Sequence, residues 1–178
     1  MEYRLRVPRP EHQQVNIEAQ EEWKKKLTKE VSRLRKAYPD ASVEIWSEDE
    51  HRIGLEPVTR RIWVEEGEVP TAIVNWKREW LWLYGFVQPQ SGETYWWILP
   101  RINTQLLTKV LQDFANHFGV GKDKHIILPL DQAGWDMSKK LEVPEGIHLF
   151  PLPPYSPELQ PAERLWVLVD EPKRQSGV

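Results

Sequence analysis

Three acidic residues stand where separate predicted elements begin or end. Asp49 follows the strand-like run of residues 42–47. Asp131 follows the apolar run 125–130, and Glu163 begins the last predicted helix. Hard divalent cations take oxygen ligands, and two of them about 3.5–4 Å apart can activate an attacking oxygen and stabilise a leaving one. If the three elements meet at one edge of a sheet, these carboxylates can build a site for phosphodiester chemistry.

Asp131 is the most suggestive of the three when each is taken alone. A carboxylate at the end of a buried strand is costly to desolvate unless a cation or a hydrogen-bond donor lies nearby. The alternative is that Asp131 simply starts the turn 131–134. The spacing of the three acids is compatible with a metal site but does not by itself prove one.

Other chemistries find no support in the sequence. The chain has no Cys, which excludes a disulfide scaffold, a thiolate metal site and a cysteine nucleophile. No glycine-rich phosphate loop is present, and the five His residues show no metal-ligand spacing. No apolar run approaches about 18 residues, and the first residues do not resemble a secretory signal.

The pattern around the acids predicts an α/β sandwich, in which helices cover a mixed sheet. The run 80–87 is apolar on both faces, as in a central strand covered on two sides. The predicted elements are a polar helix over 11–37, strands over 42–47, 60–64, 71–75, 80–87 and 94–99, a helix over 104–118 capped by Thr104 and stopped by Gly119, strands over 125–130 and 147–152, and a closing helix with Pro161 in its first turn.

The charge divides the chain into two parts. Residues 1–40 hold ten Lys and Arg against seven Asp and Glu, whereas residues 41–178 hold fourteen against twenty, so a basic arm precedes an acidic body. The first helix carries one narrow apolar stripe of Trp23, Leu27, Val31 and Leu34. This stripe favours a surface helix docked on the body, and an arm that touches DNA is the alternative.

Three blocks of the chain resemble the catalytic domain of the DDE transposases of the mariner superfamily, in particular their bacterial insertion-sequence branch. The blocks are LPPYSPELQPAERLW (152–166), IILPLDQAGWDMS (126–138) and EIWSEDEHRIGLEP (44–57), the last followed by Arg61 and Trp63. They occur in the family's order, with 31 residues between Asp131 and Glu163. The resemblance covers roughly residues 40–170.

The resemblance implies a fold, a site and a reaction. The fold is ribonuclease H-like: three antiparallel strands, then parallel strands, with flanking helices. Asp49, Asp131 and Glu163 match the family's three catalytic, metal-binding acids, which hold two Mg²⁺ or Mn²⁺ ions. The reaction is cleavage of DNA at transposon ends and attack of the freed 3′-hydroxyl on target DNA. The protein would be bacterial, cytoplasmic and nucleoid-associated, and a homodimer when active.

Several residues near the acids are candidates for contact with DNA, each with a packing alternative. The phosphate-contact candidates are Arg52, Arg60, Arg61, Tyr155 and Ser156. Packing is favoured over contact for Tyr155 and Ser156. The aromatic run of Trp76, Trp80, Trp82, Tyr84, Trp96 and Trp97 favours core packing over base stacking. The prolines of the PPYSP loop stiffen the approach to Glu163, and a polyproline ligand is the less favoured interpretation of that loop.

The chain also departs from the family pattern. Asp136 occupies a position where the family often has His. Its carboxylate would either act as an extra metal ligand or weaken DNA binding through its negative charge. Gln160 occupies the position of a family Asn. The family's helix-turn-helix region would have only the 40 residues of 1–40 to occupy, and we expect the body 41–178 to be truncated at its C-terminus. We therefore expect either half of a split element, whose DNA-binding subunit is separate, or an inactive remnant that keeps only DNA binding or self-association. The net charge of −3 does not exclude DNA, because two divalent ions would change it to +1.

Overall fold

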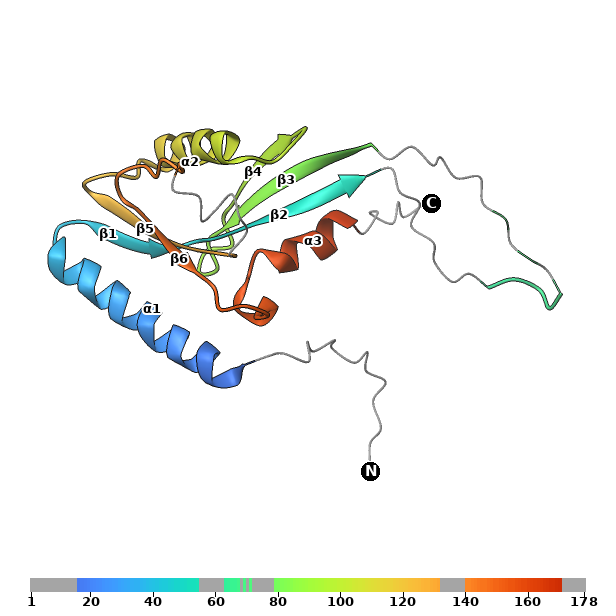
Figure 1. Cartoon of the computed structure of the whole chain (residues 1–178), viewed down its shortest axis with the longest axis horizontal. Coiled ribbons are helices and arrows are strands. Elements are labelled where there is room, and N and C mark those ends of the chain that lie inside the picture. The colour runs from blue at the N-terminus through green and yellow to red at the C-terminus, as the bar shows by residue number, and fades with distance from the viewer. Residues whose placement is uncertain are drawn as a thin grey trace, which may run out of the picture.

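The computed structural model of the chain describes residues 16–54, 63–67, 69, 71, 79–131 and 140–170. Its elements, labelled in Figure 1, are α1 (Ile17–Ala37), β1 (Ser42–Ile45), β2 (Ser47–Gly54), β3 (Trp80–Val87), β4 (Thr94–Leu99), α2 (Thr104–Phe118), β5 (Lys124–Leu130), β6 (Ile147–Pro151), the 3₁₀ helix η1 (Pro157–Leu159) and α3 (Glu163–Asp170). None of the described helices is long and apolar enough to cross a bilayer.

One extended segment joins two three-stranded ladders into a mixed sheet. β1 pairs in parallel with β5, and β5 with β6, whereas β3 pairs antiparallel with both β2 and β4. Only Trp46 separates β1 from β2, and its backbone N–H donates to the carbonyl oxygen of Ile127 at 3.0 Å. The extended segment therefore lies between parallel β5 and antiparallel β3. This is the expected ribonuclease H-like arrangement.

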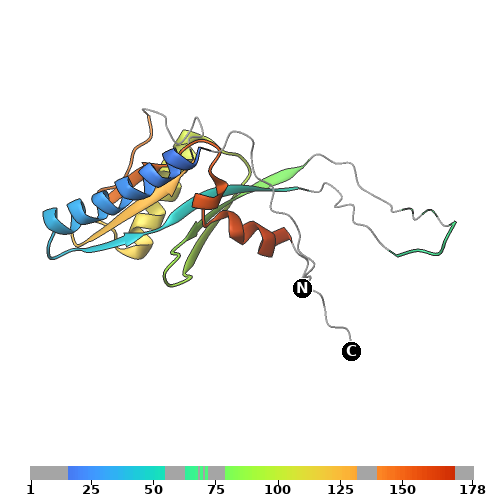
Figure 2. The same cartoon turned by 90° about the horizontal axis from the view of Figure 1, so that it is seen from below.

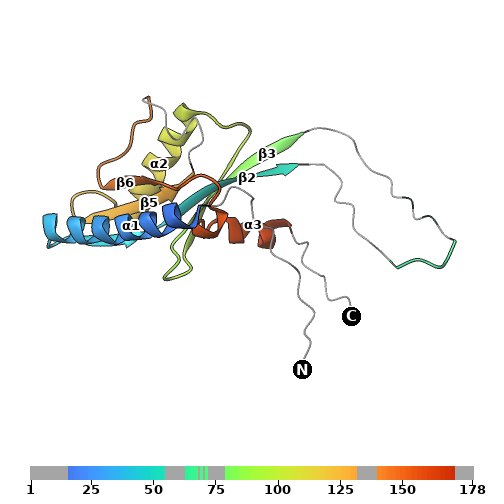
Figure 3. The same ribbon diagram turned by 60° about the horizontal axis from the view of Figure 1, so that its bottom comes forward.

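Helices cover both faces of this sheet. α2 lies on one face, and α1 and α3 lie on the other (Figures 1 and 3). The α2 face carries the main hydrophobic core, where Trp46 packs edge-on against Phe114 of α2 with ring centroids 5.1 Å apart. Burying each such side chain contributes about 1.5–3 kcal/mol. The core residues with no exposed surface are Trp46, Tyr84, Phe86, Phe114, Ile126 and Leu128.

α1 docks on the sheet through the predicted stripe. Seen from below, α1 runs along the parallel half of the sheet (Figure 2). Leu34 is fully buried, and Trp23 donates from its indole to the carbonyl oxygen of Pro151 at 2.8 Å. Gln20 is also buried, although it is polar and is not part of the predicted stripe. Asn16 caps the helix by accepting from the N–H of Ala19 at 3.0 Å, and residues 11–15 of the predicted helix lie outside the described residues.

The structure corrects several details of the sequence prediction. The predicted strand 42–47 is interrupted at Trp46 and resumes as β2, so Asp49 lies within a strand and not beyond its end. Asn103, not Thr104, caps α2, because its side chain accepts from the N–H of Leu106 at 2.9 Å. Gly119 ends that helix as predicted, with a φ of 65° that suits a residue without Cβ.

The run 80–87 is the central strand of the antiparallel ladder, as predicted, but it is not covered along its whole length. Trp80 and Leu81 are 41% and 47% exposed. In the predicted strand 60–64, the two described residues, Trp63 and Val64, are not in a strand, and Trp63 is fully exposed. The predicted strand 71–75 lies outside the described residues except for Thr71.

Candidate active site

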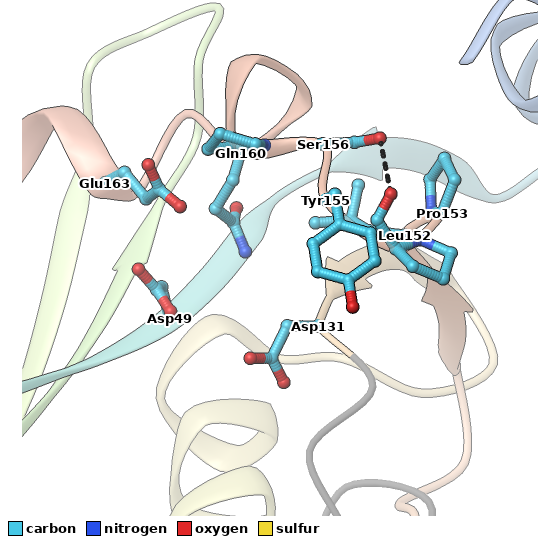
Figure 4. Close-up of a pocket in the computed structure, with 10 residues that line it drawn as sticks. Asp49, Asp131, Leu152, Pro153, Tyr155, Ser156, Gln160 and Glu163 are labelled. Atoms are coloured by element: carbon cyan, nitrogen blue, oxygen red, sulfur yellow. Dashed lines mark hydrogen bonds between the residues drawn. The ribbon is translucent and has the colours of Figure 1, made fainter. Parts of the chain in front are cut away.

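The three predicted acids line one pocket. The pocket has a volume of about 420 Å³, and Figure 4 shows the carboxyl groups of Asp49, Asp131 and Glu163 converging on it from three elements. Its remaining lining residues are Leu152, Pro153, Pro154, Tyr155, Ser156, Pro157 and Gln160, all from the proline-rich loop. The convergence expected from the sequence is therefore present.

Strand alternation explains why the acids share one side of the sheet. Asp49 is the third residue of β2 and pairs with Gly85, on the face over which α3 lies. Asp131 follows the last residue of β5, the strand parallel to β1. Glu163 is the first residue of α3, which packs on the same face as Asp49. Successive side chains of a strand point to opposite faces, so the spacing along each strand decides which acids can meet.

Four carboxylates are available for a metal, one more than predicted. One oxygen from each of Asp49, Glu50 and Asp131 lies within 4.8 Å of the other two. All the donors are carboxylate oxygens, which fits Mg²⁺ or Mn²⁺ and does not suit a soft cation. Glu163 lines the same pocket as Asp49 and Asp131 but lies outside this three-oxygen cluster. The sequence signal for Glu50 is the acidic run 48–50, of which the prediction includes only Asp49.

The pocket holds its negative charge at a cost. Burial raises the pKa of Asp49, and the negative charge of Asp131 raises it further. Hydrogen bonds from Trp166 and from the backbone N–H of Glu50 oppose this increase by lowering the pKa. Glu163 is exposed as a residue, but its carboxyl faces the pocket. Loss of hydration there, followed by the charges of Asp49, Glu158 and Asp131, raises the pKa of Glu163 to about 7. A divalent cation among these acids would stabilise their charged forms.

The loop that leads to Glu163 is fixed at both ends. Buried Ser156 donates to the carbonyl oxygen of Pro154 at 3.2 Å and accepts from Gln20 of α1 at 3.3 Å. Buried Gln160 donates to the carbonyl oxygen of Glu48 at 2.8 Å and accepts from the hydroxyl of Ser47. Proline fixes φ, so the loop loses little conformational entropy on ordering. Glu163 is thus delivered to the pocket by a braced segment.

Two residues of this network are not predicted to support the site. Trp166 is buried, and its indole N–H donates to Asp49 Oδ2 at 2.7 Å. Gln20 is not singled out by any sequence pattern. Both act across more than 100 positions of chain, so local patterns contain no signal for them.

The predicted DNA-contact residues differ in where they lie relative to the pocket. Tyr155 and Ser156 line the pocket, with Tyr155 51% exposed and Ser156 buried. Arg52 is not among the described residues that line the pocket, and its guanidinium lies 5.1 Å from the ring centroid of Trp80. Arg60, Arg61 and Asp136 lie outside the described residues.

The favoured packing role of the aromatic run is only partly confirmed. Tyr84 is fully buried, and Trp82 and Trp97 are half-buried. Trp80 and Trp96 keep 41% and 37% of their surface exposed. Trp76 lies outside the described residues.

Solved structures of Mos1 transposase share this fold. The Mos1 transposase paired-end complex with left transposon end aligns over 95% of this chain and 53% of that chain, with a TM-score of 0.59 and 21% identity. The mariner Mos1 paired end complex with Mg aligns over 95% and 53%, with a TM-score of 0.60 and 20% identity. The chain therefore spans about half the length of these proteins and shares their fold.

Sequence comparison gives the family. Over 87 residues the chain is 39% identical to the uncharacterized protein y4pE/y4sA of Sinorhizobium fredii (strain NBRC 101917 / NGR234), a match that covers 49% of this chain and 63% of that protein. The profile of the DDE superfamily endonuclease family matches residues 44–175, which include all three acids of the pocket. With most of its length matched, the chain belongs to the DDE superfamily endonuclease family.

Proposed function

We propose that this chain is the catalytic domain of a transposase, which cleaves DNA at transposon ends and joins the freed 3′-hydroxyl to target DNA. The observation that carries the proposal is the convergence of Asp49, Asp131 and Glu163 on one pocket from three separate elements. Family membership and the fold shared with Mos1 transposase support the same proposal. An inactive remnant would have no need to keep this costly concentration of charge.

The proposal assigns two Mg²⁺ or Mn²⁺ ions to the pocket, which is supported by the similarity to a mariner Mos1 paired end complex with Mg. Asp49, Glu50 and Asp131 would hold cations through their clustered oxygens, and Glu163, which lines the pocket with Asp49 and Asp131, would add a fourth carboxylate. When bound, such ions activate the attacking oxygen and stabilise the leaving oxygen. The chain's own residues hold the acids in place: Gln160 ties the loop to β2, and Trp166 fixes Asp49.

DNA is the proposed substrate and partner, as in the Mos1 complex with a transposon end. Exposed Tyr155 at the rim of the pocket is suited to contact a phosphate or a sugar, and Arg52, Arg60 and Arg61 follow the first acid in the sequence. Because the body is acidic, affinity for DNA should depend on the metal and on salt. We further propose a homodimer, a separate helix-turn-helix subunit that selects the ends, and a bacterial, nucleoid-associated location.

The division into a basic part, 1–40, and a catalytic body, 41–178, also stays a proposal. α1 belongs to the first part, outside the family match, yet it packs on the body, where Gln20 contacts the pocket loop and Trp23 contacts the end of β6. We therefore assign α1 a bracing role.

Nicking of supercoiled plasmid DNA in Mn²⁺ or Mg²⁺ tests the catalytic proposal. Asp131→Asn should lower the nicking rate by at least about 100-fold, since loss of a ligand should cost no less than loss of a partner behind the ligands. The matched control is Asp123→Asn, because exposed Asp123 immediately precedes β5 whereas Asp131 immediately follows it. Equal rates for the two variants, or nicking that persists in EDTA, would contradict the proposal.

A further inference from the structure

We propose that Trp166 is a positioning residue, whose indole N–H occupies Oδ2 of Asp49 and leaves Oδ1 as the oxygen that ligates the cation. This inference rests on the proposed function. Trp166 has no atom that binds a hard cation, because the indole nitrogen is a donor only. It would act through Asp49, by deciding how that carboxylate is presented.

The contact between Trp166 and Asp49 is short and sheltered. Nε1 lies 2.7 Å from Oδ2, at the short end of the range for N–H···O bonds, as expected when the acceptor is charged. Trp166 is only 8% exposed, so water competes weakly for either partner. Trp166 follows Glu163 by three positions, which places both side chains on one side of α3. A single helix therefore supplies one acid of the pocket and the donor that holds another.

The indole is held on several sides, so its N–H has little freedom to turn away. His51 stacks on it, with ring centroids 4.9 Å apart and an interplanar angle of 13°. Trp96 meets it edge-on at 5.9 Å. Gly85 lies beneath it and pairs with Asp49, and a Cβ on Gly85 would come within 2.7 Å of the Trp166 ring. The absence of a side chain at position 85 is what lets the ring approach the strand.

The hydrogen bond from Trp166 limits how Asp49 can coordinate a cation. Mg²⁺ binds through one or two carboxylates and keeps several waters. An Asp49 carboxylate with Oδ2 engaged by Trp166 offers one oxygen and resists bidentate binding. Partners behind metal ligands typically affect metal affinity by about 10- to 100-fold when they are removed.

Two measurements on the full chain test this inference without relying on activity. The first is the set of indole N–H resonances of ¹⁵N-labelled protein, in which Trp166→Phe and Trp97→Phe identify the two signals. Trp97 is the internal reference, because its indole also donates to a carboxylate, that of Asp113 at 3.1 Å, which is not among the acids that line the pocket. The Trp166 signal should shift on Asp49→Asn and again when Mg²⁺ is added to the unmodified chain, and the Trp97 signal should shift much less. A Trp166 signal unmoved by both changes would overturn the inference.

The second measurement is Mn²⁺ affinity from the electron paramagnetic resonance of free Mn²⁺. Trp166→Phe should weaken binding by about 10-fold or more, and Trp97→Phe, whose indole bonds to an acid outside the pocket lining, by much less. If Trp166→Phe does not fold, the response of the indole signal to Asp49→Asn still decides the question. Wild-type affinity retained in folded Trp166→Phe would overturn the positioning role and leave the proposed function standing. No Mn²⁺ binding by the unmodified chain would overturn both.

Discussion

The side-chain amide of Gln160 donates to the backbone carbonyl oxygen of Glu48 at 2.8 Å, and so joins the loop that delivers Glu163 to the strand that carries Asp49. The same amide accepts a hydrogen bond from Ser47, and both Gln160 and Ser47 are buried. Two acids more than 100 positions apart in sequence are thereby fixed relative to each other.

Gln160→Ala should lower the free energy of unfolding by about 1–3 kcal/mol, because it leaves a buried hydroxyl and a buried carbonyl without their partner. Urea unfolding measures the change. Gln160→Asn, the residue expected from the family, should cost less because it can keep one of the two bonds. Gln112→Ala on α2 is the control, since its amide bonds only to Asn116 at an exposed site. An equal loss for the Gln160 and Gln112 variants would argue against a bracing role.

Gly85→Ala should destabilise the fold, because the added Cβ would lie 2.7 Å from the Trp166 ring and 2.8 Å from the Trp96 ring. Overpacking of this kind costs about 1–3 kcal/mol. Gly121→Ala is the matched control, since no atom lies within 4 Å of the Cβ it would add. Thermal unfolding of the two variants measures the difference. An unchanged midpoint for Gly85→Ala would show that Trp166 does not pack closely against Gly85.

Glu163 should make the metal-free protein less stable as the pH rises. Its pKa is raised from 4.5 to about 7, so folding favours the protonated carboxyl. The stability from this group is fully present below pH 4.5 and is lost as the pH rises through about 7. Glu163→Gln cannot ionise and should be more stable than the wild type at pH 8 in EDTA, with the difference vanishing toward pH 4.5. Saturating Mg²⁺ should reduce the advantage at pH 8; an advantage larger at pH 5 than at pH 8 would contradict the assignment.

Gln20→Ala should loosen the pocket loop from α1. Gln20 is 7% exposed and donates to Ser156 and Glu158, both in that loop. Loss of these bonds should lower the free energy of unfolding by about 1–2 kcal/mol and speed proteolytic cleavage within residues 152–160. Lys29→Ala, at an exposed position of the same helix, should have little effect. Identical cleavage rates for the two variants would count against the bracing role of α1.

The order of elements and the meeting of the three acids could be predicted from the sequence, because both follow from local patterns and strand ends. Asp131 follows an apolar strand, and Glu163 follows a proline-rich loop at the start of a helix. The break at Trp46 could not be predicted because the run SVEIWSEDE contains no Gly or Pro to mark it, and only pairing with two different strands divides it. The capping of α2 by Asn103 was within reach of prediction, because Asn is a better N-cap than its neighbour Thr104 by residue type.

The supporting residues could not be predicted, because their roles depend on tertiary contacts. The sequence indicates Trp166 as an apolar helix residue, and nothing local shows that its N–H reaches Asp49, 117 positions away. The roles of Gln20 and Gln160 likewise depend on contacts with residues far away in the sequence. Glu50 is within reach of prediction as part of the run 48–50, but alternation along the strand places it on the face opposite Asp49, which argues against it.

The central claim is that Asp49, Asp131 and Glu163 form one metal site that cleaves DNA. The most direct measurement is Mn²⁺ binding and plasmid nicking, determined together for the wild type, Asp131→Asn and Asp123→Asn. We predict that Asp131→Asn loses at least about 10-fold in Mn²⁺ affinity and about 100-fold in nicking rate, while Asp123→Asn keeps both. Wild-type Mn²⁺ affinity and nicking in folded Asp131→Asn would contradict the account.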